Sequence, residues 1–212
     1  MKEEEALQIL GKVGAVITKS HIVYTSGRHG RDYINKDAVY PRTAEISRLC
    51  RAIAERFVND NVQVVIAPAV GGCILSNRVA EHLSDLTGRE VLGVYADKEG
   101  DGFVIRRGYD KLIADRRVLV VEDVLTTGGS ARKVVEVARA ARGKVVGLGA
   151  LCNRGGITSE DVADVPRLEV LVNVKMDSWT EEECEQDGPC SRGEPINTDV
   201  GKGREFLEKK KK

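Results

Sequence analysis

The sequence predicts an α/β fold with a mostly parallel sheet and helices on both faces. Segments of strand character alternate with segments of helical period from about Val62 to Arg154, which is the pattern of a parallel sheet. The run Val118–Val121 contains four apolar residues, three of them valine, as expected of a strand buried on both faces. Two predicted strands lead through glycine-containing loops into helices, so ligands are expected at the carboxyl ends of the strands.

Length and composition limit the class of protein. The chain has 212 residues, 42% of them hydrophobic, and no formal net charge, which suits one α/β domain with a sizeable core. A neutral chain gives no electrostatic reason to expect nucleic-acid binding, and no apolar run approaches the length of about 18 residues that indicates a membrane span. Met1–Glu5 is acidic and lacks the apolar core of a signal peptide, and the five cysteines are an odd number. We expect a cytoplasmic protein with reduced thiols.

Periodicity predicts the individual elements. Apolar residues recur with helical period in four segments, which predict helices over 4–13, 43–57, 73–86 and 131–140. Thr43 is the expected N-cap of the second helix. Apolar runs predict strands over 62–68, 91–98, 118–121, 144–153 and 168–176, the last at an edge of the sheet. Segment 21–37 is expected to form two short strands around a polar turn, and the alternation in 103–107 indicates another strand.

The segment that follows Val121 carries the strongest chemical signal. Two carboxylates, Glu122 and Asp123, are followed by a loop of hydroxyls and glycines, 126–130, and then by a helix. Glycines let backbone N–H groups approach a ligand, and the positive end of the helix dipole favours an anion, so this loop is a predicted phosphate cradle. The carboxylates repel phosphate and are suited to sugar hydroxyls or to a nearby divalent cation. Together they indicate a ribose 5-phosphate.

Val118–Ser130 resembles the 13-residue motif of the type I phosphoribosyltransferases, which bind 5-phosphoribosyl pyrophosphate (PRPP). It is neither a Walker A loop, which needs a lysine after the second glycine, nor a dinucleotide fingerprint. The alternative is an ordinary buried strand with a polar turn. The resemblance implies a type I phosphoribosyltransferase fold and a PRPP site made by Glu122, Asp123, Val124, Leu125, Thr126, Thr127, Gly128, Gly129 and Ser130.

Two further patterns resemble the orotate phosphoribosyltransferases. Thr25–His29 followed by Tyr33–Asp37 is similar to their N-terminal hood, which covers the nucleobase; the alternative is an exposed edge hairpin. The resemblance extends from about Ala6 to Phe206. It implies a single domain, 1–212, with a core at about 43–176 and a small hood built from N-terminal and C-terminal segments, about 14–42 and 177–206.

The same resemblance assigns the remaining site residues. Gly71 and Gly72 match the pyrophosphate loop, where many family members carry a lysine; the alternative is a tight packing turn. Lys98 matches the start of the mobile catalytic loop, whose later lysine and histidine fall here on Asp101 and Phe103. Two explanations remain. Either Arg106, Arg107 and Lys111 supply the missing positive charge, or the catalytic function of this loop is impaired. Arg154, with Thr126, is expected to bind orotate, unless it only solvates a strand end.

The implied reaction is transfer of the phosphoribosyl group from PRPP to orotate in pyrimidine biosynthesis. The implied catalytic residues are Lys98, Glu122, Asp123, Arg106 and Arg107. Mg²⁺ is expected to bind through PRPP near Asp123 without direct protein ligands, in a homodimeric enzyme with no nucleic-acid or membrane partner. The alternatives are a purine, xanthine or other pyrimidine substrate, since Thr25 replaces a lysine of many orotate enzymes, and a non-catalytic PRPP-sensing regulator.

The two cysteines near the carboxyl end, Cys184 and Cys190, have no second cysteine pair or histidine nearby in the sequence. A pair of this kind is a weak metal site. The sequence therefore predicts free thiols at both positions.

Overall fold

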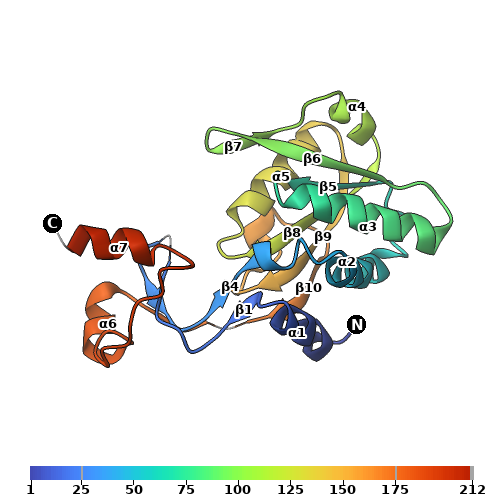
Figure 1. Cartoon of the computed structure of the whole chain (residues 1–212). Helices are drawn as coiled ribbons and strands as arrows, with labels where there is room; N and C mark the ends of the chain where they lie inside the picture. The colour runs from blue at the N-terminus through green and yellow to red at the C-terminus, as the bar shows by residue number, and fades with distance from the viewer. Residues whose placement is uncertain (25, 175, 211–212) are drawn as a thin grey trace. The chain divides into compact units, whose positions relative to one another are not determined.

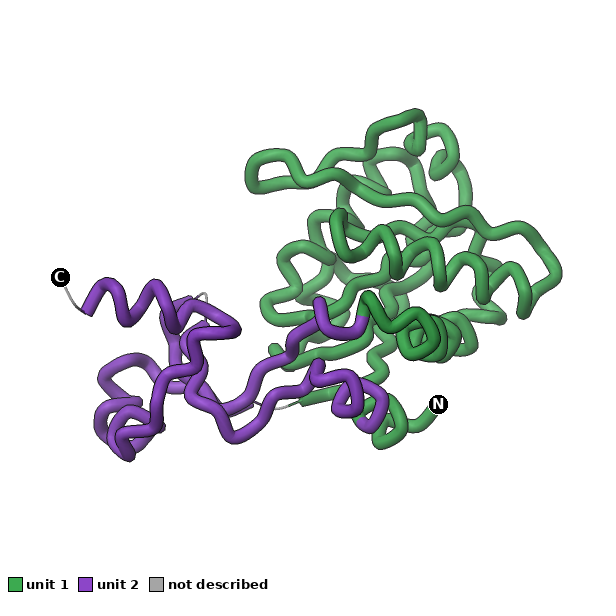
Figure 2. Tube along the Cα trace, in the orientation of Figure 1, with its two compact units in different colours: residues 1–7, 40–174 green, residues 8–39, 175–212 purple. Residues whose placement is uncertain are grey.

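The computed structural model describes residues 1–24, 26–174 and 176–210. The chain divides into two compact units, shown in Figure 2. Unit 1 comprises Met1–Leu7 and Tyr40–Val174, and unit 2 comprises Gln8–Val39 and Lys175–Lys212. Unit 2 thus combines segments from near both ends of the chain. Thr25, on which one argument about the nucleobase depends, lies outside the described residues.

Unit 1 contains a six-stranded sheet with the order β10-β9-β8-β5-β6-β7 (Figure 1). Its strands are β5 (Val64–Pro68), β6 (Leu92–Glu99), β7 (Gly102–Val104), β8 (Arg117–Leu125), β9 (Lys144–Asn153) and β10 (Leu168–Asn173). All neighbouring pairs are parallel except β6 and β7, which form an antiparallel hairpin. The predicted mostly parallel sheet is therefore confirmed, with β8 in its interior and β10 at an edge.

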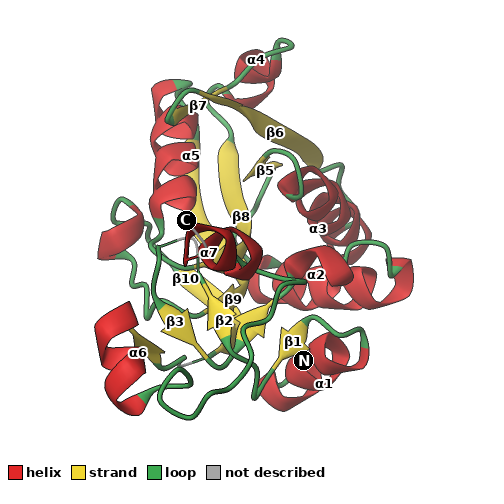
Figure 3. Ribbon diagram, turned by 60° about the vertical axis from the view of Figure 1, so that its left-hand side comes forward, coloured by secondary structure: helices red, strands yellow, loops and turns green. Residues whose placement is uncertain are grey.

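Helices cover both faces of this sheet, as the sequence predicts. Figure 3 shows α5 (Gly129–Ala140) on one side of the strands and α2 (Thr43–Phe57) and α3 (Gly72–Thr87) on the other. Alternate residues of β9 point to opposite faces of the sheet, so one strand can contact helices on both sides. A Cβ atom added at Gly149 would lie 2.6 Å from the Ile53 side chain of α2, whereas Leu148 belongs to the buried cluster that includes Val134 of α5. Small residues on one face and large ones on the other let two helices pack against the same strand.

Several boundaries differ from the sequence predictions; for example, β10 ends at Asn173, short of the predicted 176. Helix α2 has Arg42 as its N-cap, because the Arg42 carbonyl accepts the first helical hydrogen bond from Ile46, so the Thr43 N-cap prediction is wrong. Strand β8 continues through Leu125, which places Glu122 and Asp123 inside the strand rather than after it. Strand β7 is shorter than the alternation in 103–107 suggests. Arg107 and Gly108 have φ values of 60° and 75°, in the left-handed region, which is incompatible with continued strand pairing.

Unit 2 is built from very short strands and helices. The strands are β1 (Val16–Ile17), β2 (Ile22–Val23), β3 (His29–Gly30), β4 (Tyr33–Ile34) and β11 (Ser178–Trp179). They form an antiparallel β1–β4 pair and a three-stranded sheet, β11-β3-β2, so β11 from the C-terminal segment pairs with β3 from the N-terminal one. The other helices of unit 2 are η1 (Lys36–Ala38), α6 (Glu181–Asp187) and α7 (Gly203–Lys210), and α1 (Glu3–Lys12) spans the boundary between the two units. The remaining helices, α4 (Tyr109–Ile113) and η2 (Glu160–Val162), belong to unit 1. No helix in the described part of the chain is long and apolar enough to cross a membrane.

Candidate active site

The two glycine-containing loops of unit 1 meet where the strand order of the sheet reverses. After β5 the chain passes through α3 to β6 on one side, and after β8 it passes through α5 to β9 on the other. Strands β5 and β8 are direct neighbours (Figure 1). Parallel sheets form a ligand crevice at such a reversal, at the carboxyl ends of the strands. Gly71-Gly72 follows β5 and the loop 126–130 follows β8, so both predicted anion loops border this crevice.

The loop 126–130 has the backbone of a phosphate cradle. Thr126 and Thr127 are exposed directly after the buried end of β8, and α5 begins at Gly129. Gly128 has a φ of 72°, a left-handed conformation that suits glycine, and it redirects the chain into the helix. The Thr127 hydroxyl accepts a hydrogen bond of 3.4 Å from the Gly129 N–H. Hydroxyls and the positive end of a twelve-residue helix are thus presented together at one exposed turn.

The two acids behind this loop are buried and held by hydrogen bonds. Glu122 and Asp123 are 6% and 3% exposed. Asp123 Oδ1 accepts a hydrogen bond from the Val124 N–H at 2.7 Å, and Oδ2 accepts one from the Tyr40 hydroxyl at 2.8 Å. Burial, together with the adjacent Asp123 carboxylate, raises the pKa of Tyr40 above its usual value, so its hydroxyl remains a donor. Asp123 is therefore fixed in one orientation at the end of the central strand.

Tyr40 also connects the acids to the other loop. A Cβ atom added at Gly71 would lie 3.0 Å from the Tyr40 ring, and one added at Gly72 would lie 2.7 Å from the Cβ of Ala67. Close packing therefore leaves no room for a Cβ atom at Gly72 and little room at Gly71, while the backbone of both glycines lies at the crevice. The sequence analysis did not identify Tyr40. The residue lies in no periodic segment or motif, and only its contact across 83 residues shows its role.

The predicted orotate-binding residues, Arg154 and Thr126, lie together in the structure. Arg154 Nε donates a hydrogen bond of 2.9 Å to Thr126 Oγ1. The backbone N–H groups of Arg154 and Gly155 both donate to the Leu125 carbonyl, at 3.0 and 3.2 Å, and a Cβ atom on Gly155 would lie only 1.7 Å from the Thr126 carbonyl oxygen. The turn after β9 is therefore attached directly to the cradle.

The buried Asn153 side chain fixes this turn from its other side. Asn153 is 6% exposed, and its amide exchanges two hydrogen bonds with the backbone of Ile157, at 2.9 and 3.0 Å. Asn153 is a second residue that the sequence analysis did not assign. Its two hydrogen bonds close the turn that contains Arg154.

The basic residues considered for the mobile loop lie on or next to the β6–β7 hairpin. Lys98 is exposed and pairs in register with Phe103. Arg106 forms an ion pair with Glu99, and Arg107 forms one with Asp97. The hydrogen bond to Asp97 raises the pKa of Arg107. Both arginines are therefore partnered by carboxylates of β6 in this conformation.

The tip of the hairpin is attached to α5. Lys133 Nζ, on the helix that begins at the cradle, donates a hydrogen bond to the Asp101 carbonyl at the tip. The third basic residue considered for the loop, Lys111, lies in α4.

A separate groove of about 840 Å³ lies on unit 1 beside α3. Its lining includes Tyr40, Cys73, Tyr95 and Tyr109, but neither of the two acids nor the loop 126–130. Two large apolar side chains of the same region are exposed, Val70 at 86% and Ile74 at 40%. The groove is therefore a surface feature next to the Gly71-Gly72 loop rather than the predicted phosphate site.

A parallel sheet whose central strand carries two buried acids and ends in a hydroxyl- and glycine-rich cradle defines the phosphoribosyltransferase class. The model of the phosphoribosyl transferase domain family matches residues 35–187. The chain belongs to this family, and its curated relatives are orotate phosphoribosyltransferases, which are pentosyltransferases.

Similar sequences and a similar crystal structure support this family assignment. The chain is 38% identical to the orotate phosphoribosyltransferase of Pelotomaculum thermopropionicum, over 92% of this chain and 95% of the relative. It is 36% identical to that of Caldanaerobacter subterraneus, over 92% and 96% of the two chains. The crystal structure of orotate phosphoribosyltransferase from Aeropyrum pernix superposes with a TM-score of 0.64 at 28% identity, covering 85% of this chain and 97% of that one.

One prediction about unit 2 rests on a wrong premise. Cys184 and Cys190 form no disulfide, but histidines do lie near them in space. The nearest are His21 and His29, from the N-terminal segment. A separation of 163 residues between His21 and Cys184 hid this proximity from sequence reasoning.

Proposed function

We propose that this chain transfers the 5-phosphoribosyl group of PRPP to orotate and releases pyrophosphate. The observation that carries the proposal is the 2.9 Å hydrogen bond between Arg154 and Thr126, which holds a guanidinium beside the predicted phosphate cradle. A guanidinium binds a carboxylate through two parallel hydrogen bonds. Orotate carries a carboxylate, whereas uracil and the purine bases do not. The names of the curated relatives support the same substrate.

Each part of the crevice has a proposed role in this reaction. The hydroxyls and N–H groups of 126–130 bind the 5-phosphate, and the backbone of Gly71 and Gly72 faces the pyrophosphate. The bond from the anomeric carbon to pyrophosphate breaks with its electron pair going to the leaving group. A ring nitrogen of orotate bonds to that carbon, and its proton passes to the departing pyrophosphate or to water. Positive charge develops on the ribose, and the carboxylates of Glu122 and Asp123 stabilise it while they bind the ribose hydroxyls.

The acid pair fits a Mg²⁺ ion that is held through PRPP. Each Asp123 oxygen accepts a hydrogen bond, from Val124 or from Tyr40, which fixes the orientation of the carboxylate. A carboxylate has about four lone-pair sites, so a group held in this way can also accept from a ligand in the crevice. A carboxylate so fixed is suited to a water of the hydrated ion, since Mg²⁺ usually keeps several waters. The ion, when bound, would neutralise the charge of the leaving diphosphate.

Lys98 is the proposed partner of the departing pyrophosphate, with Arg106 or Arg107. Lys98 is exposed, whereas each arginine would first have to leave its carboxylate partner. That pairing favours a second candidate function, a regulator that binds PRPP without turnover. Turnover with any base would eliminate this second candidate.

Assembly and location complete the proposal. Both units are proposed to form one phosphoribosyltransferase domain, and the enzyme is proposed to be a cytoplasmic homodimer. The exposed Val70 and Ile74 beside the groove support the dimer, because a second copy would remove their apolar surface from water. Light scattering tests this assembly, and a fully active monomer would contradict it. Cell fractionation tests the location.

A panel of bases tests the function. Orotate, uracil, hypoxanthine, xanthine and adenine are each incubated with PRPP and Mg²⁺, and pyrophosphate release is measured. We expect release with orotate alone. Release with a purine or xanthine instead would assign another base, and tight PRPP binding without release on any base would assign the regulator.

A further inference from the structure

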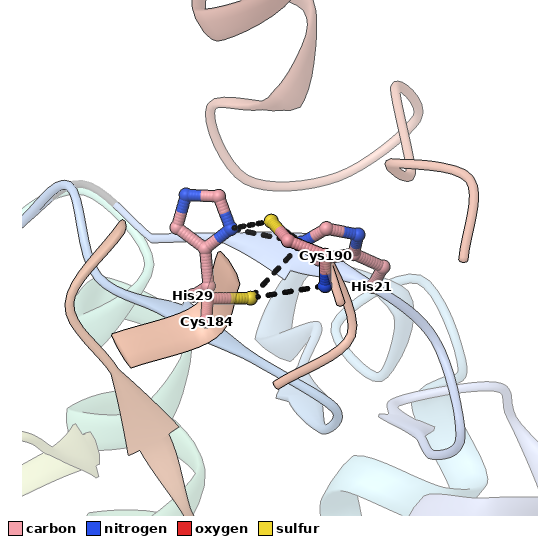
Figure 4. Close-up of side chains that lie close together, drawn as sticks. All are labelled: His21, His29, Cys184 and Cys190. Carbon is pink, nitrogen blue, oxygen red and sulfur yellow. Dashed lines mark hydrogen bonds between the residues drawn. The ribbon is translucent and has the colours of Figure 1, made fainter. Parts of the chain in front are cut away.

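Four potential metal ligands of unit 2 converge on one point. They are the side chains of His21, His29, Cys184 and Cys190, here called the His/Cys cluster, and Figure 4 shows them directed toward one another. One ligand atom from each residue lies within 4.8 Å of all the others. His29 and Cys184 are fully buried, and His21 is 2% exposed. The cluster involves none of the residues assigned to the PRPP site.

The distances in the cluster approach those of a tetrahedral zinc site. Zn–N and Zn–S bonds of about 2.05 and 2.3 Å place nitrogen and sulfur ligands about 3.5 Å apart. The Cys190 Sγ lies 3.6 Å from His21 Nε2 and 3.5 Å from His29 Nδ1, and the Cys184 Sγ lies 3.8 Å from His21 Nε2. The two histidine nitrogens are 2.8 Å apart, so they would separate by about 0.5 Å around an ion.

The surroundings orient the ligand atoms toward the centre. His21 Nδ1 lies 2.8 Å from the Glu194 carbonyl oxygen, which can only accept, so Nδ1 carries the proton and Nε2 presents its lone pair to the cluster. A second hydrogen bond of this kind is usual for zinc-bound histidine. The Cys190 N–H donates to the Cys184 sulfur at 3.2 Å, an interaction that stabilises a thiolate. The His29 ring makes its described hydrogen-bonding contacts through Nδ1, which lies near His21 Nε2 and the Cys190 sulfur.

A metal also fits the way unit 2 is built. Its sheets consist of two-residue strands, and its two segments are separated in sequence by the Tyr40–Val174 part of unit 1. Two ligands come from the first segment and two from the second. A cross-link that closes so long a loop removes much conformational freedom from the unfolded chain. Small units with little regular structure commonly depend on such a link.

We propose that the His/Cys cluster binds one structural Zn²⁺ ion that joins the N-terminal and C-terminal segments of unit 2. Two imidazoles and two thiolates form a closed four-ligand set, which is typical of structural rather than catalytic zinc. Zinc is preferred to harder ions because thiolates select it over magnesium, calcium or manganese. The ion acts on folding and takes no part in phosphoribosyl transfer.

Metal analysis of the full-length protein is the first test. Protein purified in reducing buffer with zinc in the growth medium should contain one zinc per chain. The Cys184→Ser/Cys190→Ser and His29→Asn variants should lose it. Cys73→Ser and His82→Gln are the matched controls, because these residues lie outside the cluster, and both should keep the zinc. Equal zinc in the cluster variants and the controls, iron in place of zinc, or no metal in the wild type would overturn the proposal.

Cobalt substitution of the wild-type protein is the second test and does not depend on any variant folding. Adding Co²⁺ to the metal-free protein should produce thiolate-to-metal charge transfer and intense tetrahedral ligand-field bands, which Zn²⁺ should abolish. The melting temperature should fall after chelation and recover with zinc. A spectrum without thiolate bands, a disulfide between Cys184 and Cys190 in the native protein, or an unchanged melting temperature would refute the site. None of these readouts uses orotate or PRPP, so they are independent of the base panel.

Discussion

The two strand–loop–helix junctions of unit 1 share a topology but differ in chemistry. Both leave the carboxyl end of a central parallel strand, and both enter a helix of twelve or more residues. The β8–α5 junction carries two buried acids and three hydroxyl side chains. The β5–α3 junction carries neither at Gly71-Gly72 and is packed against the Tyr40 ring and Ala67.

This difference separates two uses of glycine. Gly128 has a left-handed φ of 72°, and a Cβ atom there would also lie 3.1 Å from the Val162 side chain. Gly72 lies in a helix, and a Cβ atom there would lie only 2.7 Å from the Cβ of Ala67, so space is its main restriction. The first junction can therefore select a ligand with side chains, and the second offers only backbone. It follows that side-chain substitutions should affect catalysis most at the β8–α5 junction.

Asp123→Asn is the largest expected effect. The substitution keeps the shape of the side chain but removes the charge that stabilises the ribose, so kcat should fall roughly 100-fold or more. Stability should change much less, because the amide oxygen can still accept a hydrogen bond. Asp115→Asn is the control, since that carboxylate is 69% exposed on the surface. Steady-state kinetics and thermal unfolding measure the two effects. Normal turnover by Asp123→Asn would contradict the assignment of the acid pair.

Arg154→Ala should act on orotate rather than on PRPP. Losing a charged hydrogen-bonding partner of the substrate carboxylate costs about 1.5–3 kcal/mol, which corresponds to a KM for orotate roughly 10- to 100-fold higher. Arg154→Lys should recover only part of the loss, because an ammonium does not make the bidentate contact. Arg132→Ala is the control, since Arg132 pairs with Glu136 on the surface of α5. A selective rise in the KM for PRPP would place Arg154 elsewhere in the site.

The two glycines should respond differently to substitution. At Gly128 a valine should cost roughly 1–3 kcal/mol of unfolding free energy, because β-branched residues disfavour a positive φ, and asparagine should cost less, because it tolerates that region. At Gly72 even alanine should cost about 1–3 kcal/mol through overpacking, and asparagine should be worse. Denaturant unfolding measures all four variants. Equal losses for asparagine and valine at Gly128 would show that space rather than φ is limiting there.

The sequence was sufficient for the architecture because apolar periodicity follows buried strands and helices directly. It predicted the parallel sheet, the interior position of β8 and the edge position of β10. It did not predict that β8 continues through Glu122 and Asp123. Buried acids interrupt an apolar run although hydrogen bonds hold them in the strand. Local patterns therefore located the exposed loop and the start of α5 but placed the two acids outside the strand that contains them.

Contacts between distant residues could not be predicted in this way. Tyr40 reaches Asp123 across 83 residues, and the His/Cys cluster joins residues separated by as many as 169. Neither has a local spacing that signals its function, because the geometry arises only when the segments fold together. The β6–β7 hairpin is a related case, since ion pairs with Glu99 and Asp97 cannot be read from the charges alone.

Tyr40→Phe tests the link between the two junctions. It removes one hydrogen bond to Asp123, so the unfolding free energy should fall by about 1–3 kcal/mol at neutral pH, and kcat by less than in Asp123→Asn. Phenylalanine keeps the ring against Gly71, which makes it a matched replacement for packing. Denaturant unfolding and steady-state kinetics of both proteins measure these changes.

The pH dependence of the same variant sharpens the test. The pKa of Tyr40 is raised in the folded state above its usual 10.0, because burial and the adjacent acids disfavour the phenolate. Below pH 10 the residue is protonated whether the chain is folded or not. As pH rises above that value the unfolded chain ionises first, which draws the wild type toward unfolding. Phenylalanine has no such proton, so the stability advantage of the wild type should shrink above about pH 10. An advantage that stays constant into that range would show that Tyr40 titrates normally and does not hold Asp123.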